Sequence, residues 1–177
     1  RVFQASGKGI NGSTALGVQT IGSFDAQIYI KTTTIGLKGN IFSFYARTER
    51  NGGGNRPVRV SYYFSDAGQK SQPQALGSSD SFPNTDTDYR LWEIPIPEHW
   101  RNRESVTLNL TIHYGEGTGS SARWYMDDFG ISLSEAFEPD PSDPDPADPV
   151  DGTPVFPSLQ RSEVLDGYTV NLTFDNP

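Results

Sequence analysis

The sequence predicts an all-β protein, an antiparallel β-sandwich, from three observations. Short segments in which apolar and polar residues alternate recur along the chain, as in strands that bury one face. Glycine and proline are abundant, with 18 and 13 residues, as expected where many turns join strands. No segment keeps the 3.6-residue period of an amphipathic helix, and only residues 97–104 have room for a short helical turn.

The predicted strands follow one another at short intervals. Phe42, Phe44 and Ala46 share one face of the third strand, and Leu108, Leu110 and Ile112 share one face of the sixth. The glycine-rich segment 51–55 predicts a hairpin tip between the third and fourth strands. The chain already resembles a strand at residues 1–3, and the expected strands after it are residues 15–18, 26–32, 41–47, 58–64, 89–96, 106–114 and 123–133.

Composition divides the chain into three parts. Residues 1–137 are predicted to form the β-sandwich module. Residues 138–157 hold seven of the 13 prolines and six acidic residues without Lys or Arg, which predicts an extended, semi-rigid linker. Residues 158–177 contain one alternating strand at 168–174, and they are the start of a following domain or an added strand; we favour the former.

Charge and composition argue against several functions. Residues 1–137 carry 13 acidic and 13 basic residues, so no basic field exists to attract nucleic acid. No apolar run approaches the roughly 18 residues that span a membrane. The Gly-x-Gly-x-x-Gly pattern at 7–12 leads into another strand instead of a helix, which argues against a dinucleotide loop. With no cysteine, two histidines and no Gly-x-Ser-x-Gly, nothing singles out a nucleophile and its base, so we expect no enzyme.

Two adjacent carboxylates, Asp127 and Asp128, interrupt the apolar strand 123–133. Unpaired buried charge is costly, so a divalent cation, Arg123 or backbone amides must satisfy them. The motif Trp-Tyr-Met-Asp-Asp-Phe-Gly-Ile resembles the last strand of galactose-binding-like (jelly-roll) carbohydrate-binding modules of secreted polysaccharide-degrading enzymes. The segments 11–18, 41–47 and 92–97 resemble earlier strands of that family, in the same order along residues 7–135.

This resemblance implies a structural Ca2+ held in part by Asp127 and Asp128. The family's N-terminal acidic ligand has no counterpart in Val2-Phe3-Gln4. The alternative is a carboxylate that caps backbone amides or pairs with Arg123.

Strand parity suggests a binding face. If the alternating apolar residues point inward, their neighbours form an outward row of rings, amides and cations. Such a row suits sugars, because pyranose C–H faces lie on aromatic rings while planar polar groups bind the hydroxyls. Trp92 and Trp124 are expected in the core, whereas Trp100 is expected to be exposed, as a loop-borne sugar platform. The candidate ligand-binding residues are Tyr29, Tyr45, Arg47, Arg59, Tyr63, Asn109, His113 and Trp100.

The function expected from the sequence is non-catalytic binding of polysaccharide, which targets a secreted multidomain protein to glycan. Lys31, Arg47 and Arg59 would favour a sulfated or uronic, hence anionic, glycan. The expected partners are this polysaccharide and covalently linked neighbouring domains, outside the cell or on its surface and in a bacterium. The alternative is a structural or adhesive β-sandwich repeat of a cell-surface or filament protein, whose faces contact other proteins.

Overall fold

The computed structural model describes residues 1–22, 24–36, 39–132, 159–166 and 169–174. The predicted linker at 138–157 lies outside these residues. In the described part of the chain, no helix is long and apolar enough to cross a membrane. The strands are β1 (Val2–Ala5), β2 (Ala15–Gln19), β3 (Ala26–Thr32), β4 (Ile41–Glu49), β5 (Val58–Asp66), β6 (Gln69–Lys70), β7 (Gln74–Leu76), β8 (Arg90–Pro95), β9 (Val106–Tyr114), β10 (Arg123–Ser132), β11 (Leu159–Asp166) and β12 (Thr169–Phe174), with short 3₁₀ turns η1 (Ile10–Gly12) and η2 (Glu98–Trp100).

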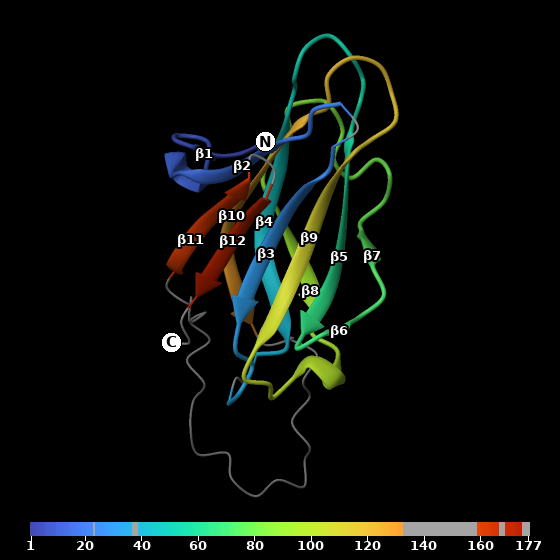
Figure 1. Cartoon of the computed structure of the whole chain (residues 1–177). Coiled ribbons are helices and arrows are strands. Elements are labelled where there is room, and N and C mark those ends of the chain that lie inside the picture. Colours follow the sequence, from blue (N-terminus) through green and yellow to red (C-terminus); the bar gives the residue numbers. More distant parts are fainter. Residues whose placement is uncertain (23, 37–38, 133–158, 167–168, 175–177) are drawn as a thin grey trace, which may run out of the picture.

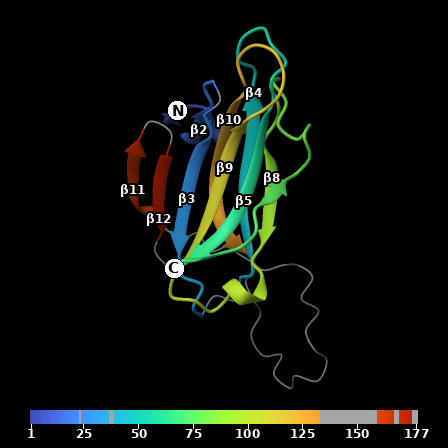
Figure 2. The same ribbon diagram turned by 45° about the vertical axis from the view of Figure 1, so that its right-hand side comes forward.

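The strands form two sheets packed face to face, as the sequence predicts (Figure 1). One sheet has the order β1-β2-β10-β4-β8, and the other has the order β11-β12-β3-β9-β5-β6, with β7 beside β5. Figure 2 shows β3, β9 and β5 side by side in front of the sheet that contains β4 and β10. The protein is therefore a β-sandwich with two outer faces, each made by the outward side chains of one sheet.

Alternating burial within each strand builds the core between the sheets. Along β4 the even-numbered residues from Phe42 to Thr48 are buried and their neighbours are half-buried. Large rings supply much of the packing. The ring centroids of Phe82 and Trp92 are 4.7 Å apart, and those of Phe44 and Trp124 are 6.2 Å apart in an edge-on arrangement. The expectation that Trp92 and Trp124 belong to the core is confirmed, with 6% and 0% of their surfaces exposed.

The predicted hairpin at residues 51–55 is wrong. The strands on either side, β4 and β5, belong to different sheets, so this glycine-rich segment crosses from one sheet to the other. Asn84 holds the crossover in place, because its buried amide donates to the carbonyl oxygens of Asn51, Gly54 and Ser120 and accepts the Asn51 N–H. Glycine is required at 54, where a Cβ would lie 1.9 Å from the Thr118 carbonyl oxygen.

The last described strand, β12, joins the same sandwich. β12 pairs with β3 in parallel, with Asn171 opposite Tyr29 and Thr173 opposite Lys31. This is the added-strand alternative for residues 158–177, and it makes β12–β3 a parallel pair in a largely antiparallel fold. In Figure 1, β12 lies beside β3, and β11 lies beyond β12 at the edge of the sheet.

Candidate functional site

The outward side chains of β3, β9 and β5 form one continuous surface, which we call the β3–β9–β5 face. The strand register brings its rows together: Tyr29 lies opposite Asn109, and Asn109 lies opposite Tyr63. The face therefore collects five of the eight candidate ligand-binding residues, namely Tyr29, Arg59, Tyr63, Asn109 and His113. Its full set is Gln27, Tyr29, Lys31, Arg59, Ser61, Tyr63, Ser65, Thr107, Asn109, Thr111 and His113.

Tyr45 and Arg47 do not belong to this face. They lie on β4, in the opposite sheet, so parity correctly predicts their outward direction but not the sheet from which they point. The Arg47 guanidinium packs over the rings of Tyr89 and Tyr125, 5.3 and 4.8 Å from their centroids. Burial raises the pKa of both tyrosines. Arg47 also pairs with Glu49 at 3.8 Å, so its guanidinium already has partners within its own sheet.

The expectation that Trp100 is an exposed platform is wrong. Only 4% of its surface is exposed, and its indole stacks on Phe64 in the core. The Arg103 guanidinium covers the indole at 5.4 Å. A buried tryptophan cannot stack on a sugar, so Trp100 drops out of the candidate site.

Two residues of the face are committed to other side chains or to the backbone. The Asn109 amide nitrogen donates to the Tyr63 carbonyl, the Ser65 hydroxyl and the Thr107 carbonyl, and the residue is 3% exposed. The Tyr29 hydroxyl donates to the Gln27 side chain. Asn109 therefore stiffens the face, and the exposed groups around it are left to meet a ligand.

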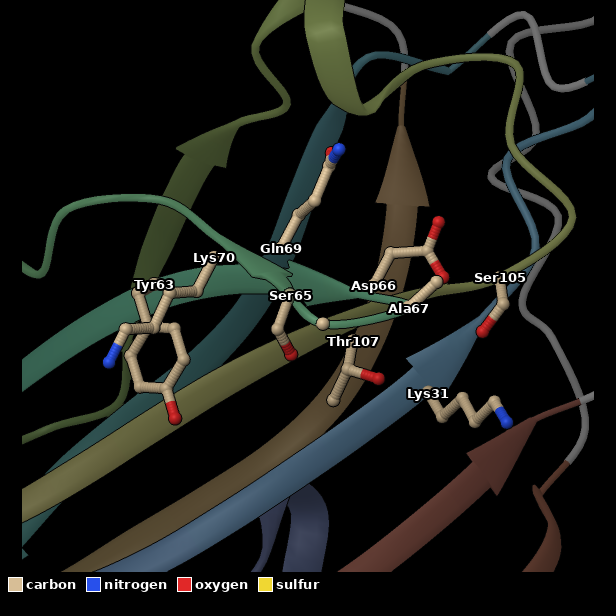
Figure 3. Close-up of a pocket in the computed structure, with 10 residues that line it drawn as sticks. Lys31, Tyr63, Ser65, Asp66, Ala67, Gln69, Lys70, Ser105 and Thr107 are labelled. Atoms are coloured by element: carbon tan, nitrogen blue, oxygen red, sulfur yellow. The ribbon is translucent and has the colours of Figure 1, made fainter.

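A hollow of about 350 Å³ opens at the β5–β6 end of this face (Figure 3). The β5–β6 turn forms one wall, and positive φ angles at Ala67 (43°) and Gly68 (83°) make this turn tight. Tyr63, Ser65 and Thr107 bring a ring and two hydroxyls into it. The complete lining is Lys31, Tyr63, Ser65, Asp66, Ala67, Gly68, Gln69, Lys70, Ser105 and Thr107.

The charges around the hollow are unbalanced. Asp66 is paired with Arg103 at 3.4 Å, so its negative charge is already compensated. Lys31 and Lys70 are exposed, and neither has a carboxylate within 4.0 Å among the side chains that the structure describes. The hollow thus offers two ammonium groups, hydroxyls and a phenol ring, a combination that fits a polar ligand with a negative group.

The two adjacent aspartates lie on the other sheet, at a β-bulge. The register of β10 against β4 shifts between Asp127 and Gly130, and Asp128 takes a left-handed conformation with φ 49°. The bulge lets Asp127 point outward, leaves Asp128 exposed and returns Phe129 to the core, where it stacks on Phe42 at 5.6 Å. Burial, and next the Asp127 charge, raise the pKa of Asp128.

Asp127 has a partner that needs no metal. Its Oδ2 accepts the Ile10 N–H and the Ser13 hydroxyl, each at 2.8 Å, which anchors the loop before β2 to β10. Calcium prefers six to eight oxygen ligands, and the described residues contain no group of three or more acidic or histidine side chains that could hold a metal ion. The calcium site implied by the resemblance stays a prediction.

Sequence reasoning missed several residues that the structure adds to the face. Lys70, Gln69 and Asp66 reach the hollow only because β5 turns back tightly into β6, and Asp25 reaches His113 from just before β3. No periodic signal marks a two-residue strand, so β6 could not be predicted. Asp25 continues the outward alternation of Gln27, Tyr29 and Lys31, so applying the alternation one residue before β3 would have found it.

Comparison with known proteins bears on the fold. No family model and no curated protein matches the sequence. Among solved structures, the family 30 carbohydrate-binding module of the cellulosomal cellulase Cel9D-Cel44B of Clostridium thermocellum is 12% identical, with a TM-score of 0.50 over 76% of this chain and 83% of that one. A family 16 carbohydrate-binding module (16% identity, TM-score 0.37, 73% and 84% covered) and infectious bursal disease virus, Gx strain (12%, 0.36, 72% and 31%) also match.

The first of these likenesses confirms the predicted fold. The chain has the β-sandwich, or jelly-roll, fold of a carbohydrate-binding module.

Proposed function

We propose that this chain binds polysaccharide on the β3–β9–β5 face, with an anionic group of the glycan held in the hollow. The observation that carries the proposal is that Lys31 and Lys70 line the same hollow as Tyr63, with no carboxylate within 4.0 Å of either lysine among the described side chains. A carboxylate or sulfate accepts charge-assisted hydrogen bonds from ammonium groups. A pyranose ring packs its C–H face on a phenol ring, and its hydroxyls bond Ser65 and Thr107.

The net negative charge of the protein opposes non-specific binding of an anionic polysaccharide. The net charge is −8, so the protein as a whole repels a polyanion. Long-range repulsion is screened beyond roughly 10 Å in ordinary buffer, whereas a contact inside the hollow is not. Binding to a polyuronate therefore requires a local site, and non-specific attraction cannot imitate it.

Polysaccharide binding would give the chain a targeting role. A secreted protein that carries this module stays near its polymer, and a tether raises the effective concentration of any linked domain at that surface. Binding of this kind involves no covalent step.

Affinity electrophoresis of the full 177-residue chain tests the proposal, with gels that contain neutral or anionic polysaccharides. We expect retardation by a polyuronate or sulfated polymer, about tenfold weaker in Tyr63→Ala because a ring contact is worth 0.5–1.5 kcal/mol or more. Tyr45→Ala is the matched control, because it removes the same group from the opposite sheet. Retardation equal in both variants, or no retardation by any polymer, would contradict the proposal, and the second result would favour a structural or adhesive repeat.

The anionic part of the proposal has its own comparison. Lys31→Ala and Lys70→Ala are expected to weaken retardation by the anionic polymer several-fold. Arg50→Ala removes the same charge from an exposed position after β4 and is expected to leave retardation unchanged. A ligand that is neutral would leave the lysine variants indistinguishable from Arg50→Ala.

A further inference from the structure

Three side chains, two from strands and one from the residue just before a third strand, form a hydrogen-bonded chain on the β3–β9–β5 face, outside the lining of the hollow. The Ser61 hydroxyl lies 2.7 Å from His113 Nε2, and His113 Nδ1 lies 2.8 Å from Asp25 Oδ2. Ser61 is on β5, His113 is on β9, and Asp25 directly precedes β3. The order serine, imidazole, carboxylate is the arrangement that activates a serine nucleophile.

The hydrogen-bond partners fix the direction of proton transfer. An ionised carboxylate only accepts hydrogen bonds, so the His113 Nδ1–H donates to Asp25. The Nε2 atom of His113 then has a free lone pair that can accept the Ser61 proton. The second Asp25 oxygen accepts the Tyr114 N–H at 3.1 Å, which holds the carboxylate in place. Each member therefore has the partner that its role requires, and Asp25 acts as a positioning residue for the imidazole.

Arg59 completes the group. It lies opposite His113 in the β5–β9 ladder, on the same face and two residues before Ser61. Its only ion pair among the described residues is a loose one, 3.8 Å from Glu116, and both side chains are largely exposed. A guanidinium on this face is a group of the kind that stabilises a developing oxyanion when a substrate draws it away from Glu116.

We propose that Ser61 is a His113-activated nucleophile that hydrolyses acyl esters. Ser61 Oγ attacks the ester carbonyl while its proton passes to His113 Nε2; the C–O bond to the alcohol then breaks, and His113 returns the proton to the leaving oxygen. Water then attacks the acyl-serine carbonyl while His113 Nε2 takes its proton; the C–O bond to Ser61 breaks, His113 returns the proton to Ser61 Oγ, and the carboxylic acid leaves. The position of the group on the glycan face points to O-acylated sugars as substrates, and this choice rests on the proposed function.

The nucleophile itself is tested without any sugar. The full chain is incubated with a fluorophosphonate probe, which phosphonylates activated serines, and the modified peptide is identified by mass spectrometry. We expect one adduct, on Ser61, absent in Ser61→Ala and formed at least 100-fold more slowly in His113→Gln, the lower range for loss of a general base. Asp25→Asn is expected to slow labelling as well, because it removes the carboxylate that orients the imidazole.

Matched controls separate activation from mere exposure. Ser43→Ala removes a half-buried, outward serine of β4 in the opposite sheet, and His99→Gln removes the other histidine; both are expected to label like the wild type. Hydrolysis of p-nitrophenyl acetate should follow the same order of variants. Wild-type labelling no greater than that of Ser61→Ala, with circular dichroism unchanged, would overturn the proposal.

The outcomes also separate this proposal from polysaccharide binding. Retardation in the anionic gel is compared between the wild type and Tyr63→Ala, whereas labelling is compared between the wild type and Ser61→Ala, so each result is read independently of the other. Labelling without retardation would leave the nucleophile standing while the glycan proposal fails. Retardation without labelling would do the reverse.

Discussion

The indole of Trp100 stacks on the ring of Phe64, with centroids 6.2 Å apart and planes 28° from parallel. Trp100 belongs to η2, outside both sheets, and its ring is part of the buried core. A residue that looks like a surface platform in the sequence is therefore a structural part of the fold.

Trp100→Ala is expected to lower the free energy of unfolding by about 3–5 kcal/mol, because it removes a large buried ring and leaves a cavity. Urea denaturation followed by circular dichroism measures the loss. Trp100→Phe keeps part of the packing and should lose less. A Trp100→Ala protein as stable as the wild type but unable to bind polysaccharide would restore the platform role.

Asp127→Ala is expected to lower the free energy of unfolding by about 1–3 kcal/mol, because the partly buried Ile10 N–H and the exposed Ser13 hydroxyl both lose a charged acceptor. Asp128→Asn is the matched comparison. The Asp128 backbone has a positive φ that asparagine also adopts readily, and its exposed side chain accepts no hydrogen bond from the described residues comparable to those of Asp127, so stability should be nearly unchanged. Equal losses in both variants would argue that the two carboxylates act together.

A chelator tests the calcium prediction directly. With Asp127 Oδ2 already bonded to two donors, we expect EGTA to leave the thermal unfolding midpoint unchanged. A drop of several degrees that is reversed by added Ca2+, and that is missing in Asp127→Asn, would instead support the metal site.

Glu49 is expected to make stability depend on pH. Burial raises its pKa, but the hydrogen bonds from Lys8 and Arg123 and the charges of Lys8 and Arg47 outweigh burial and leave the pKa below its ordinary value. A lowered pKa in the folded state contributes stability above the unfolded value of about 4.3, and this contribution disappears as pH falls through the lower folded value. Glu49→Gln should lack this acid-side loss in urea unfolding between about pH 5 and pH 3.

The control for this pH dependence is Glu93→Gln, on the exposed side of β8. The Glu93→Gln protein should lose stability in acid as the wild type does. If the wild type and Glu49→Gln lose stability in parallel, the Lys8 and Arg123 contacts do not stabilise the folded protein.

Much of the fold follows from local pattern. Alternation along β4, β5 and β9 predicts which residues face the core, because side chains alternate strictly along a strand. It does not predict the sheet to which a strand belongs. Residues 51–55 have the composition of a hairpin tip, yet Asn84, which is 33 residues from Asn51, turns the segment into a crossover through bonds that sequence spacing does not reveal.

The candidate site depends even more on tertiary structure. Tyr45 and Tyr63 both point outward from strands with similar alternating sequences, and only the assignment of β4 and β5 to different sheets places them on different faces. Ser61 and His113 are 52 residues apart, and Asp25 and His113 are 88 apart. Without a local motif around any of the three, the pairing of strands is the only signal that brings them together.

The pairing of β12 with β3 has a consequence for how the protein is handled. Backbone hydrogen bonds of β3 are satisfied on one side by a strand that follows the linker in the chain. A shortened chain that ends at residue 137 would leave that row of amide and carbonyl groups bare, and an open edge of this kind joins edges of other molecules. If this fragment self-associates while the longer chain stays monomeric, the cause is the exposed edge of β3 and not an adhesive function of the protein.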